Sequence, residues 1–277
     1  MFTQQHAITV DLEDWFHVCA AADAAALSCE SRVVPATSAV LELLQRQRVR
    51  ATFFVLGSVA AQHPALIERI AEAGHELASH GWSHRLVFEL QPDQFADELQ
   101  RTADLVERLS GQRPTGFRAP RWSLCRRRTP WAFEILMQQG YRYDSSLTPL
   151  ALIGDPDGPR GPHLIEVGQS RLWELPPLVT ATPFGNLPTG GGWGFRFFPQ
   201  RLISTTLQQY GQAGLPGVLF IHPRECDPQG PRLALGPLRE FVTYGPRSSA
   251  AGRLERLLTS FSFTTLGDLV RSWQPAS

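Results

Sequence analysis

The chain of 277 residues is 43% hydrophobic and 19% charged, a composition that supports a sizeable buried core. Its 26 basic and 26 acidic residues give a net charge of zero, which argues against nucleic acid or an anionic membrane surface as the main partner. No apolar run reaches the roughly 18 residues of a transmembrane helix. The N-terminal residues lack the basic and apolar regions of a secretory signal, so we expect a cytoplasmic protein with free thiols.

Short apolar runs alternate with amphipathic segments in the first half of the chain. The apolar runs predict strands at residues 7–11, 51–57, 75–80, 115–120 and 141–146. The amphipathic segments predict helices at residues 37–49, 64–74, 93–111 and 129–140. Thr37 and Ser38 are the candidate N-caps of the first of these helices.

The alternation stops near residue 148, where proline and glycine become frequent. We expect a loop-rich insertion at about 148–198, with one or two strands, including residues 171–177. The alternation then resumes, with helices predicted at 199–214 and 249–261, strands at 217–223 and 263–266, and a closing helix. Strands that alternate with helices form parallel sheets. The chain is therefore predicted to be one α/β domain over residues 1–277, a distorted (β/α) barrel of about seven strands.

Polar side chains follow the predicted strands at the points where these strands end. The residues are Asp11, Glu13 and Asp14 after the first strand, His80 and His84 after the third, and Arg118, Asp144 and His222 at later strand ends. Because a barrel brings the carboxyl ends of its strands to one face, we expect these side chains to meet in one pocket.

The segment "ASHGWSHRL" places His80 and His84 four residues apart. Two imidazoles and one carboxylate form a three-ligand set with open positions, which is typical of catalytic zinc and suits other divalent ions as well. The zinc-protease form of this spacing needs a glutamate after the first histidine, and this chain has Gly81 there. A base for hydrolysis must therefore come from another strand.

Four segments carry a family resemblance. "TVDLED", "HGWSH", "FRAPRWS" and "LFIHP", in this order between about residues 8 and 223, resemble the motifs of the polysaccharide deacetylases, the NodB-homology domains of carbohydrate esterase family 4. "DLEDWFH" and "GGGWGFRFFP" further resemble a subgroup found with bacterial exopolysaccharide and capsule loci. The resemblance implies a distorted (β/α) barrel that removes acetyl groups from N-acetylated sugars. It also implies a divalent metal, Zn²⁺ in the first place, with Co²⁺, Ni²⁺ or Mn²⁺ as alternatives.

The family roles transfer to this chain residue by residue. The resemblance implies that Asp11 is the general base and that Arg118 orients it. It implies that His80 and His84 are metal ligands and that His222 is the general acid, which gives its proton to the departing amine.

One departure from the family pattern concerns the third metal ligand. The usual first motif has two adjacent aspartates, whereas here leucine follows Asp11. Because alternate strand residues share a face, we expect Glu13 as the ligand, with Asp14 as the alternative if the strand bends. The fourth motif is not evident, and Asp144 is either a charge partner of His222 or an ordinary turn residue.

Several residues are candidates for substrate contact. By resemblance, the backbone N–H of Arg121 would bind the oxyanion. Trp82, Trp122, Trp193 and Phe195 are aromatic candidates for stacking on sugar rings, and packing in the core or in loops is the alternative for each. The glycines of "TGGGWGF" suit a loop that lies over the cleft.

The predicted function is metal-dependent removal of acetyl groups from N-acetylated sugars of a polysaccharide or its precursor. One alternative keeps the fold and hydrolyses a small-molecule amide, as allantoinase-like relatives do. The other alternative is a non-catalytic sugar-binding module, although such a module has no need for a base and an acid.

Overall fold

The computed structural model describes residues 5–18, 30–151, 154–227, 229–233, 235–245 and 250–272. In these ranges no helix combines the length and the apolar character needed to cross a membrane. Cys125 and Cys226 are free, whereas Cys19 and Cys29 lie outside the described residues.

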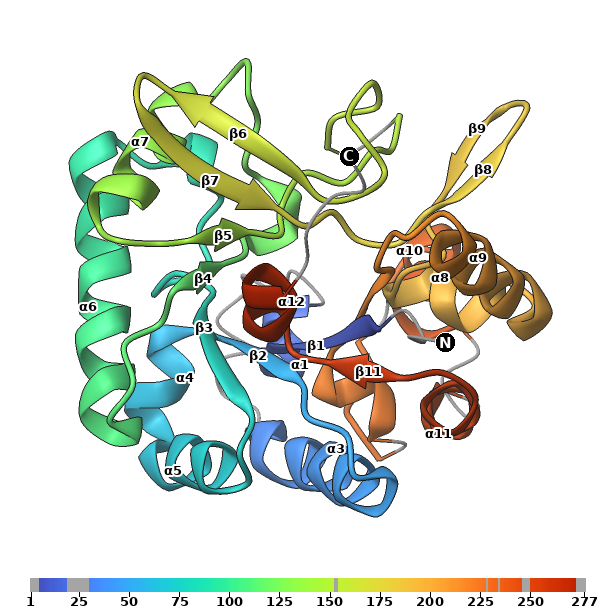
Figure 1. Cartoon of the computed structure of the whole chain (residues 1–277). Coiled ribbons are helices and arrows are strands. Elements are labelled where there is room, and N and C mark those ends of the chain that lie inside the picture. The colour runs from blue at the N-terminus through green and yellow to red at the C-terminus, as the bar shows by residue number, and fades with distance from the viewer. Residues whose placement is uncertain are drawn as a thin grey trace.

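A nine-stranded, curled sheet forms the centre of the molecule (Figure 1). Its strands are β1 (His6–Leu12), β2 (Thr52–Val55), β3 (Glu76–Ser79), β4 (Gly116–Phe117), β5 (Tyr143–Asp144), β6 (His163–Val167), β7 (Ser170–Glu174), β10 (Val218–Ile221) and β11 (Phe263–Thr264). They run in the order β10-β1-β2-β3-β4-β5-β7-β6, and β11 pairs with the start of β1. The pairs are parallel except β6 with β7. The predicted barrel is confirmed, and of the strands in this sheet only β6 has no counterpart among the predicted strands.

Helices cover the outside of the curled sheet (Figure 1). They are α3 (Val33–Gln47), α4 (Gly57–Gln62), α5 (Pro64–Glu72), α6 (Pro92–Ser110), α7 (Pro130–Gln138), α9 (Gln200–Gln212) and α11 (Ala250–Ser260). The last helix, α12 (Leu266–Ser272), packs Leu266 and Leu269 against Ala7 and Val218 near the starts of β1 and β10. It therefore closes the amino-terminal end of the barrel and leaves the carboxyl end for the site.

The alternation of side chains along β1 determines which residues reach the barrel interior. Ile8, Val10 and Leu12 belong to the core between sheet and helices, whereas Ala7 belongs to the inner cluster. Because side chains alternate with a period of two, Asp11 shares the inner face with Ala7. Burial of the outer side chains contributes roughly 1.5–3 kcal/mol each and holds this register, since a shift by one residue would turn Asp11 outward.

The start of α3 differs from the prediction. The helix begins at Val33, so Thr37 is a buried residue inside it and the Ser38 hydroxyl donates to the Val34 carbonyl. Pro35 lies in the first helical turn, where its missing N–H costs no intrahelical hydrogen bond. Neither Thr37 nor Ser38 is therefore an N-cap.

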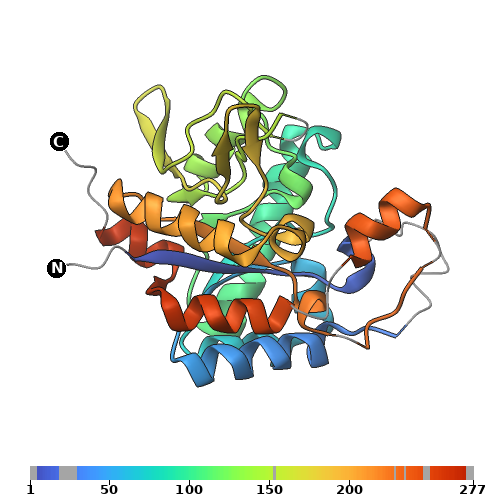
Figure 2. The same ribbon diagram turned by 90° about the vertical axis from the view of Figure 1, so that its right-hand side faces the viewer.

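Residues 148–198 contain more regular structure than the expected loops. The hairpin β6–β7 adds β7 to the sheet beside β5, and a second hairpin joins β8 (Thr180–Thr182) to β9 (Gly185–Leu187). A short helix, α8 (Gly192–Phe197), follows. Two further helices, α1 (Trp15–Val18) and α10 (Pro237–Tyr244), lie beyond the carboxyl end of β1, on the right in Figure 2.

Candidate metal centre and active site

A carboxylate and two imidazoles meet at the carboxyl ends of β1 and β3. Glu13 Oε1 lies 2.8 Å from His80 Nε2 and 3.1 Å from His84 Nε2. The ligand atoms of these three residues all lie within 4.8 Å of one another, and Glu13 and His80 are buried. The structure thus brings together both predicted histidines and the carboxylate on the inner face of β1.

The imidazole of His80 is held in one orientation by the next strand. Its Nδ1 lies 2.7 Å from the carbonyl oxygen of Arg118 and can only donate to it. A proton on Nδ1 leaves Nε2 with a free lone pair that faces Glu13, which is the arrangement of a metal-ligating histidine. The Nε2 atom of His84 is buried, and its 3.1 Å approach to Glu13 Oε1 does not have the geometry of a hydrogen bond. Two imidazole nitrogens beside a carboxylate, one of them unsatisfied, fit a divalent cation.

The carboxyl group of Glu13 carries its charge in this setting. Burial works against the charged form, but the neighbouring His84 and His80 outweigh it and hold the pKa of Glu13 well below its ordinary value. The buried site therefore contains an ionised carboxylate. Its negative charge adds to the affinity of this cluster for a cation.

Backbone strain gathers around the same cluster. His84, Arg121 and Trp122 have φ angles of 63°, 51° and 58°, in the left-handed region that side chains with a Cβ rarely adopt. Such residues cost of the order of 1–3 kcal/mol each and occur mainly where the surrounding structure enforces them, often at functional sites. No local sequence signal, such as glycine or asparagine, indicated these conformations.

Arg118 and Asp11 form a buried ion pair behind the cluster. The Arg118 side chain is 1% exposed, and its Nη1 donates to Asp11 Oδ1 at 2.7 Å and to the Thr9 hydroxyl at 2.8 Å. Nε and Nη2 donate to the backbone carbonyl and the hydroxyl of Ser145 at 3.0 and 2.8 Å. Because its donors bind on both sides of the barrel interior, Arg118 fixes the direction of the Asp11 carboxylate.

His222 faces Asp11 from the end of β10. Its Nε2 lies 3.8 Å from Asp11 Oδ2, and its Nδ1 lies 3.7 Å from Glu225 Oε2. Burial lowers the pKa of His222, but Glu225 together with Glu13 and Asp11 outweighs it, and the pKa is raised above its ordinary value. One ring nitrogen of His222 thus faces the site, and a carboxylate stands behind the other.

Glu225 is the partner that the sequence interpretation missed. It follows His222 by three residues in "HPRE", within the short helical turn Pro223–Cys226. This spacing is the signal that could have found it, because residues three apart in a helical turn can meet. Asp144, the predicted charge partner of His222, instead lies beside Ser146 and Glu174, so this prediction is wrong.

Asp144 belongs to a second pair of buried carboxyl groups. It is 0% exposed, as is Glu174 at the end of the neighbouring strand β7. Asp144 Oδ1 accepts from the Ser146 hydroxyl, and Glu174 Oε1 accepts from the backbone N–H of Leu147. Burial raises the pKa of both groups, and for Glu174 the neighbouring Asp144 raises it further.

Asp14 binds backbone groups at the starts of two helices. Its Oδ1 accepts from the backbone N–H groups of Trp15 at 2.7 Å and Arg32 at 3.1 Å. It caps the start of α1 and ties it to the beginning of α3, and it is absent from the ligand groups found among the described residues. The geometry therefore favours Glu13 over Asp14 for a third ligand.

His17 is a further residue near the site that the sequence interpretation missed. Its ring lies 5.4 Å from that of His84, and its Nδ1 accepts the backbone N–H of Asp14 at 3.2 Å. Burial lowers the pKa of His17 to about 4, so the ring is neutral at neutral pH. Its position one helical turn after Glu13 was the available signal.

The tryptophans proposed for sugar contact lie in different surroundings. Trp122 packs on Phe220, and the Arg118 guanidinium lies 5.2 Å from its ring, so it borders the site. Trp82 packs against the outer core beneath the Arg101 guanidinium, 4.1 Å away, and Trp193 packs on other aromatic rings of α8 and its end. Trp82 and Trp193 are both half-buried, and their sugar contacts stay a prediction.

The structure also places Phe195, Arg121 and the glycine-rich segment, which were predicted to lie near the substrate. Phe195 is 1% exposed and belongs to the outer core, so it is a packing residue. Arg121 is exposed and stands beside Trp122 in the short helical turn after β4. The segment "TGGGWGF" lies alongside β10 rather than over a cleft, because Phe220 donates its N–H to the Gly190 carbonyl.

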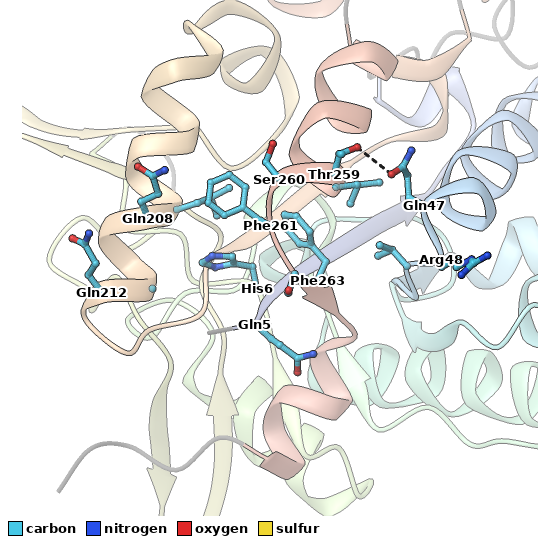
Figure 3. A pocket seen from close by; sticks show the side chains of 15 residues that line it. Gln5, His6, Gln47, Arg48, Gln208, Gln212, Thr259, Ser260, Phe261 and Phe263 are labelled. Atoms are coloured by element: carbon cyan, nitrogen blue, oxygen red, sulfur yellow. Dashed lines mark hydrogen bonds between the residues drawn. The ribbon is translucent and has the colours of Figure 1, made fainter. Parts of the chain in front are cut away.

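A cavity of about 750 Å³ lies at the opposite end of β1 (Figure 3). Residues that line it include Gln5, His6, Gln208 and Phe261, from the start of β1, from α9 and from the segment before β11. Because its lining residues come from the start of β1 and from the helices outside the sheet, it is separate from the cluster around Glu13.

The fold and the cluster together define a distorted (β/α) barrel with a potential metal centre at the carboxyl ends of its strands. Residues 18–143 match the family of polysaccharide deacetylases, and residues 145–271 match a domain of unknown function, DUF3473. The predicted likeness to the polysaccharide deacetylases, the NodB-homology domains of carbohydrate esterase family 4, is thus confirmed for residues 18–143, a little under half of the chain.

Relatives with assigned names match only part of the chain. A peptidoglycan-N-acetylglucosamine deacetylase of Bacillus cereus is 32% identical over 98 residues, which are 35% of this chain and 36% of that protein. A peptidoglycan deacetylase of Helicobacter pylori is 32% identical over 108 residues, or 39% of this chain and 36% of that protein. The matched segments thus span about a third of each relative's length.

Solved structures match over nearly the whole chain. A putative polysaccharide deacetylase from Mycobacterium smegmatis has a TM-score of 0.68 at 22% identity, over 99% of this chain and 93% of that one. A pseudoenzyme of the same esterase family from Bacillus anthracis has a TM-score of 0.53 at 12% identity, over 97% of this chain and 66% of that one. These likenesses show the fold, and the function must be argued from the site.

Proposed function

We propose that this protein is a divalent-metal-dependent deacetylase that acts on N-acetylated sugars of an exopolysaccharide or its precursor. The observation that carries the proposal is the pairing of His222 with Asp11, 3.8 Å apart, beside the buried group of Glu13, His80 and His84. A hydrolase needs a base, an acid and an electrophile at one place, and a sugar-binding module needs none of these.

Glu13, His80 and His84 would hold the metal. The unsatisfied Nε2 of His84 and the oriented Nε2 of His80 support this assignment. The bound ion would supply Lewis acidity to the acetyl carbonyl and to a water molecule. Nitrogen and oxygen ligands are compatible with Zn²⁺, and also with Co²⁺, Ni²⁺ or Mn²⁺.

Asp11 is suited to take a proton from the attacking water. Arg118 occupies its Oδ1, so that Oδ2 remains to face the site and His222. The four side-chain hydrogen bonds of Arg118 hold this orientation before substrate binds. Such pre-organisation spares the reaction the cost of turning the carboxylate.

His222 is suited to protonate the leaving amine through Nε2. Glu225 stands behind Nδ1, and the raised pKa of His222 favours the imidazolium that a general acid requires near neutral pH. Base and acid therefore approach the scissile amide from neighbouring strands, β1 and β10.

The turn after β4 is suited to bind the acetyl group. The strained backbone of Arg121 would present its N–H to the developing oxyanion, and Trp122 would border the sugar. The chain's zero net charge suits a neutral or weakly charged glycan better than a strongly charged polymer. The "DLEDWFH" and "GGGWGFRFFP" segments support an exopolysaccharide-related substrate by resemblance.

The test is acetate release from a panel of N-acetyl sugars and glycans, with and without a chelator. We expect release that the chelator abolishes and added metal restores, and that His84→Ala eliminates. His163→Ala is the matched control, because His163 lies on β6, and it should keep activity. Release that persists in His84→Ala, or no release from any sugar, would contradict the proposal. Cleavage of a cyclic amide instead would favour the allantoinase-like alternative.

A further inference from the structure

The glycine-rich segment before α8 lies directly against β10. Gly190 accepts the N–H of Phe220 at 2.8 Å, and Gly191 forms a parallel bridge with the same residue. A Cβ at Gly191 would collide with the backbone oxygen of Phe220, and one at Gly194 with that of Pro188. Gly191 is therefore needed for the close approach to β10, the strand that His222 follows.

This close approach places Arg196 of α8 beside Glu225, the carboxylate next to the proposed general acid His222. Arg196 is 3% exposed, and its Nε, whose N–H donates to the Gly192 carbonyl at 3.2 Å, forms an ion pair with Glu225 Oε1 at 2.8 Å. The other oxygen of Glu225, Oε2, lies 3.7 Å from His222 Nδ1 and accepts the backbone N–H of His222 at 3.0 Å. One carboxylate thus joins the arginine to the histidine.

We propose that Arg196 is a positioning residue for deacetylation, which holds Glu225 in the orientation that aims His222 at the substrate. The inference rests on the proposed function, in which His222 is the general acid. Segment 190–196 then helps to position the general acid His222. A buried carboxylate without a cationic partner would pay a large desolvation penalty, so Arg196 is what keeps Glu225 charged and in place.

The electrostatics of Glu225 agree with this arrangement. Burial by itself raises the pKa of the Glu225 carboxyl group, but His222 and Arg196 outweigh it and lower that pKa to about 2. A carboxylate that is ionised throughout the working range of pH can accept from His222 Nδ1 whenever that nitrogen is protonated.

Arg196 also has a structural task, which the experiment must separate from the proposed one. Its Nη2 donates to the Val242 carbonyl at 2.9 Å and thereby anchors the end of α10. Arg224 provides a matched control, because it is also 3% exposed and donates to the Thr243 carbonyl of the same helix at 3.0 Å. Its ion pairs do not include Glu225 among the described residues.

The kinetic test is a double-mutant cycle of Arg196→Met and Glu225→Gln. We expect Arg196→Met to lower kcat roughly 10- to 100-fold with little change in KM, as for other outer partners of site groups. Arg196→Lys, which keeps the charge, should recover part of the loss. If Arg196 acts through Glu225, the double variant should be no slower than Glu225→Gln alone. Arg224→Met should stay within about threefold of the wild type.

A second measurement does not depend on activity. Histidine-selective ¹⁵N NMR, assigned with His222→Asn, reports the ring of His222 in the folded protein. Arg196→Met should move the His222 ring signals as Glu225→Gln does, and Arg224→Met should leave them in place. Unchanged ring signals in Arg196→Met, or multiplicative losses of kcat in the cycle, would overturn the inference. If no acetyl sugar is cleaved, the proposed function fails and the NMR comparison still decides the role of Arg196.

Discussion

Replacing Glu13 by glutamine tests which carboxylate completes the metal centre. Glu13 Oε1 is the atom shared by both histidines, at 2.8 and 3.1 Å, and glutamine keeps its shape but removes its charge. Asp14→Asn is the matched control, because Asp14 Oδ1 caps α1 and asparagine retains an accepting oxygen there. The two variants therefore separate metal binding from helix capping.

The magnitude follows from linkage between binding and folding. Metal at 100 times its dissociation constant stabilises a protein by about 2.7 kcal/mol. Loss of a direct ligand should weaken binding by at least about 100-fold, the upper end of what outer partners cost. The same metal concentration would then stabilise Glu13→Gln by only ~0.4 kcal/mol. At about 2–4 °C per kcal/mol for a chain of this size, the metal-induced shift in Tm should shrink by roughly 5–9 °C.

The assay is thermal unfolding of each protein with and without Zn²⁺, each compared with its own metal-free form. We expect a large shift for the wild type and for Asp14→Asn, and almost none for Glu13→Gln. A full shift in Glu13→Gln together with its loss in Asp14→Asn would refute the assignment. No shift in the wild type would refute the metal centre itself.

Three further predictions test other groups of the site. Glu225→Gln removes a carboxylate that raises the pKa of His222, so the protonated acid should be lost at lower pH, and the alkaline limb of kcat/KM against pH should move downward. Arg118→Met should destabilise the fold by about 3–5 kcal/mol in urea unfolding, because it leaves the buried Asp11 carboxylate without its cationic partner. Arg101→Met, at the surface over Trp82, should cost less than about 1 kcal/mol. Glu174→Gln should make stability less sensitive to rising pH, since the native state must otherwise hold a proton on a carboxyl group whose pKa is raised.

Each of these predictions has an outcome that contradicts it. An unchanged pH profile in Glu225→Gln would show that His222 does not depend on this carboxylate. Equal losses of stability in Arg118→Met and Arg101→Met would contradict the larger free-energy cost expected for breaking the buried pair of Arg118 and Asp11. For Glu174→Gln, the free energy of unfolding should fall less than that of the wild type from about pH 5 to about pH 9, and an equal fall would count against a proton held on Glu174 in the native state.

Much of the fold was predictable because its signals are local. Apolar runs and amphipathic periods depend on neighbours within a few residues, and the expected strands around 7–11, 51–57 and 75–80 appear as β1, β2 and β3. The start of α3 and the hairpins within 148–198 were missed, because weak local patterns there leave the outcome to packing against the sheet.

The approach of Glu13 to His80 and His84 was predictable for the same reason. Alternation along β1 places Glu13 on the face of Asp11, and a parallel barrel brings the ends of β1 and β3 to one edge. Two periodic rules, neither of which needs tertiary coordinates, were sufficient.

The sequence by itself determined the barrel and the residue types that meet at its carboxyl end, since periodicity and side-chain chemistry are properties of short segments. Only the tertiary structure decided which of these ionisable side chains contact one another. Asp144 lies beside Glu174 because β7 pairs with β5 in the sheet. His222 lies beside Glu225, which in turn forms an ion pair with Arg196 of α8. Such choices depend on contacts between segments far apart in the chain, because burial leaves each charged group only the partner that packing brings within reach.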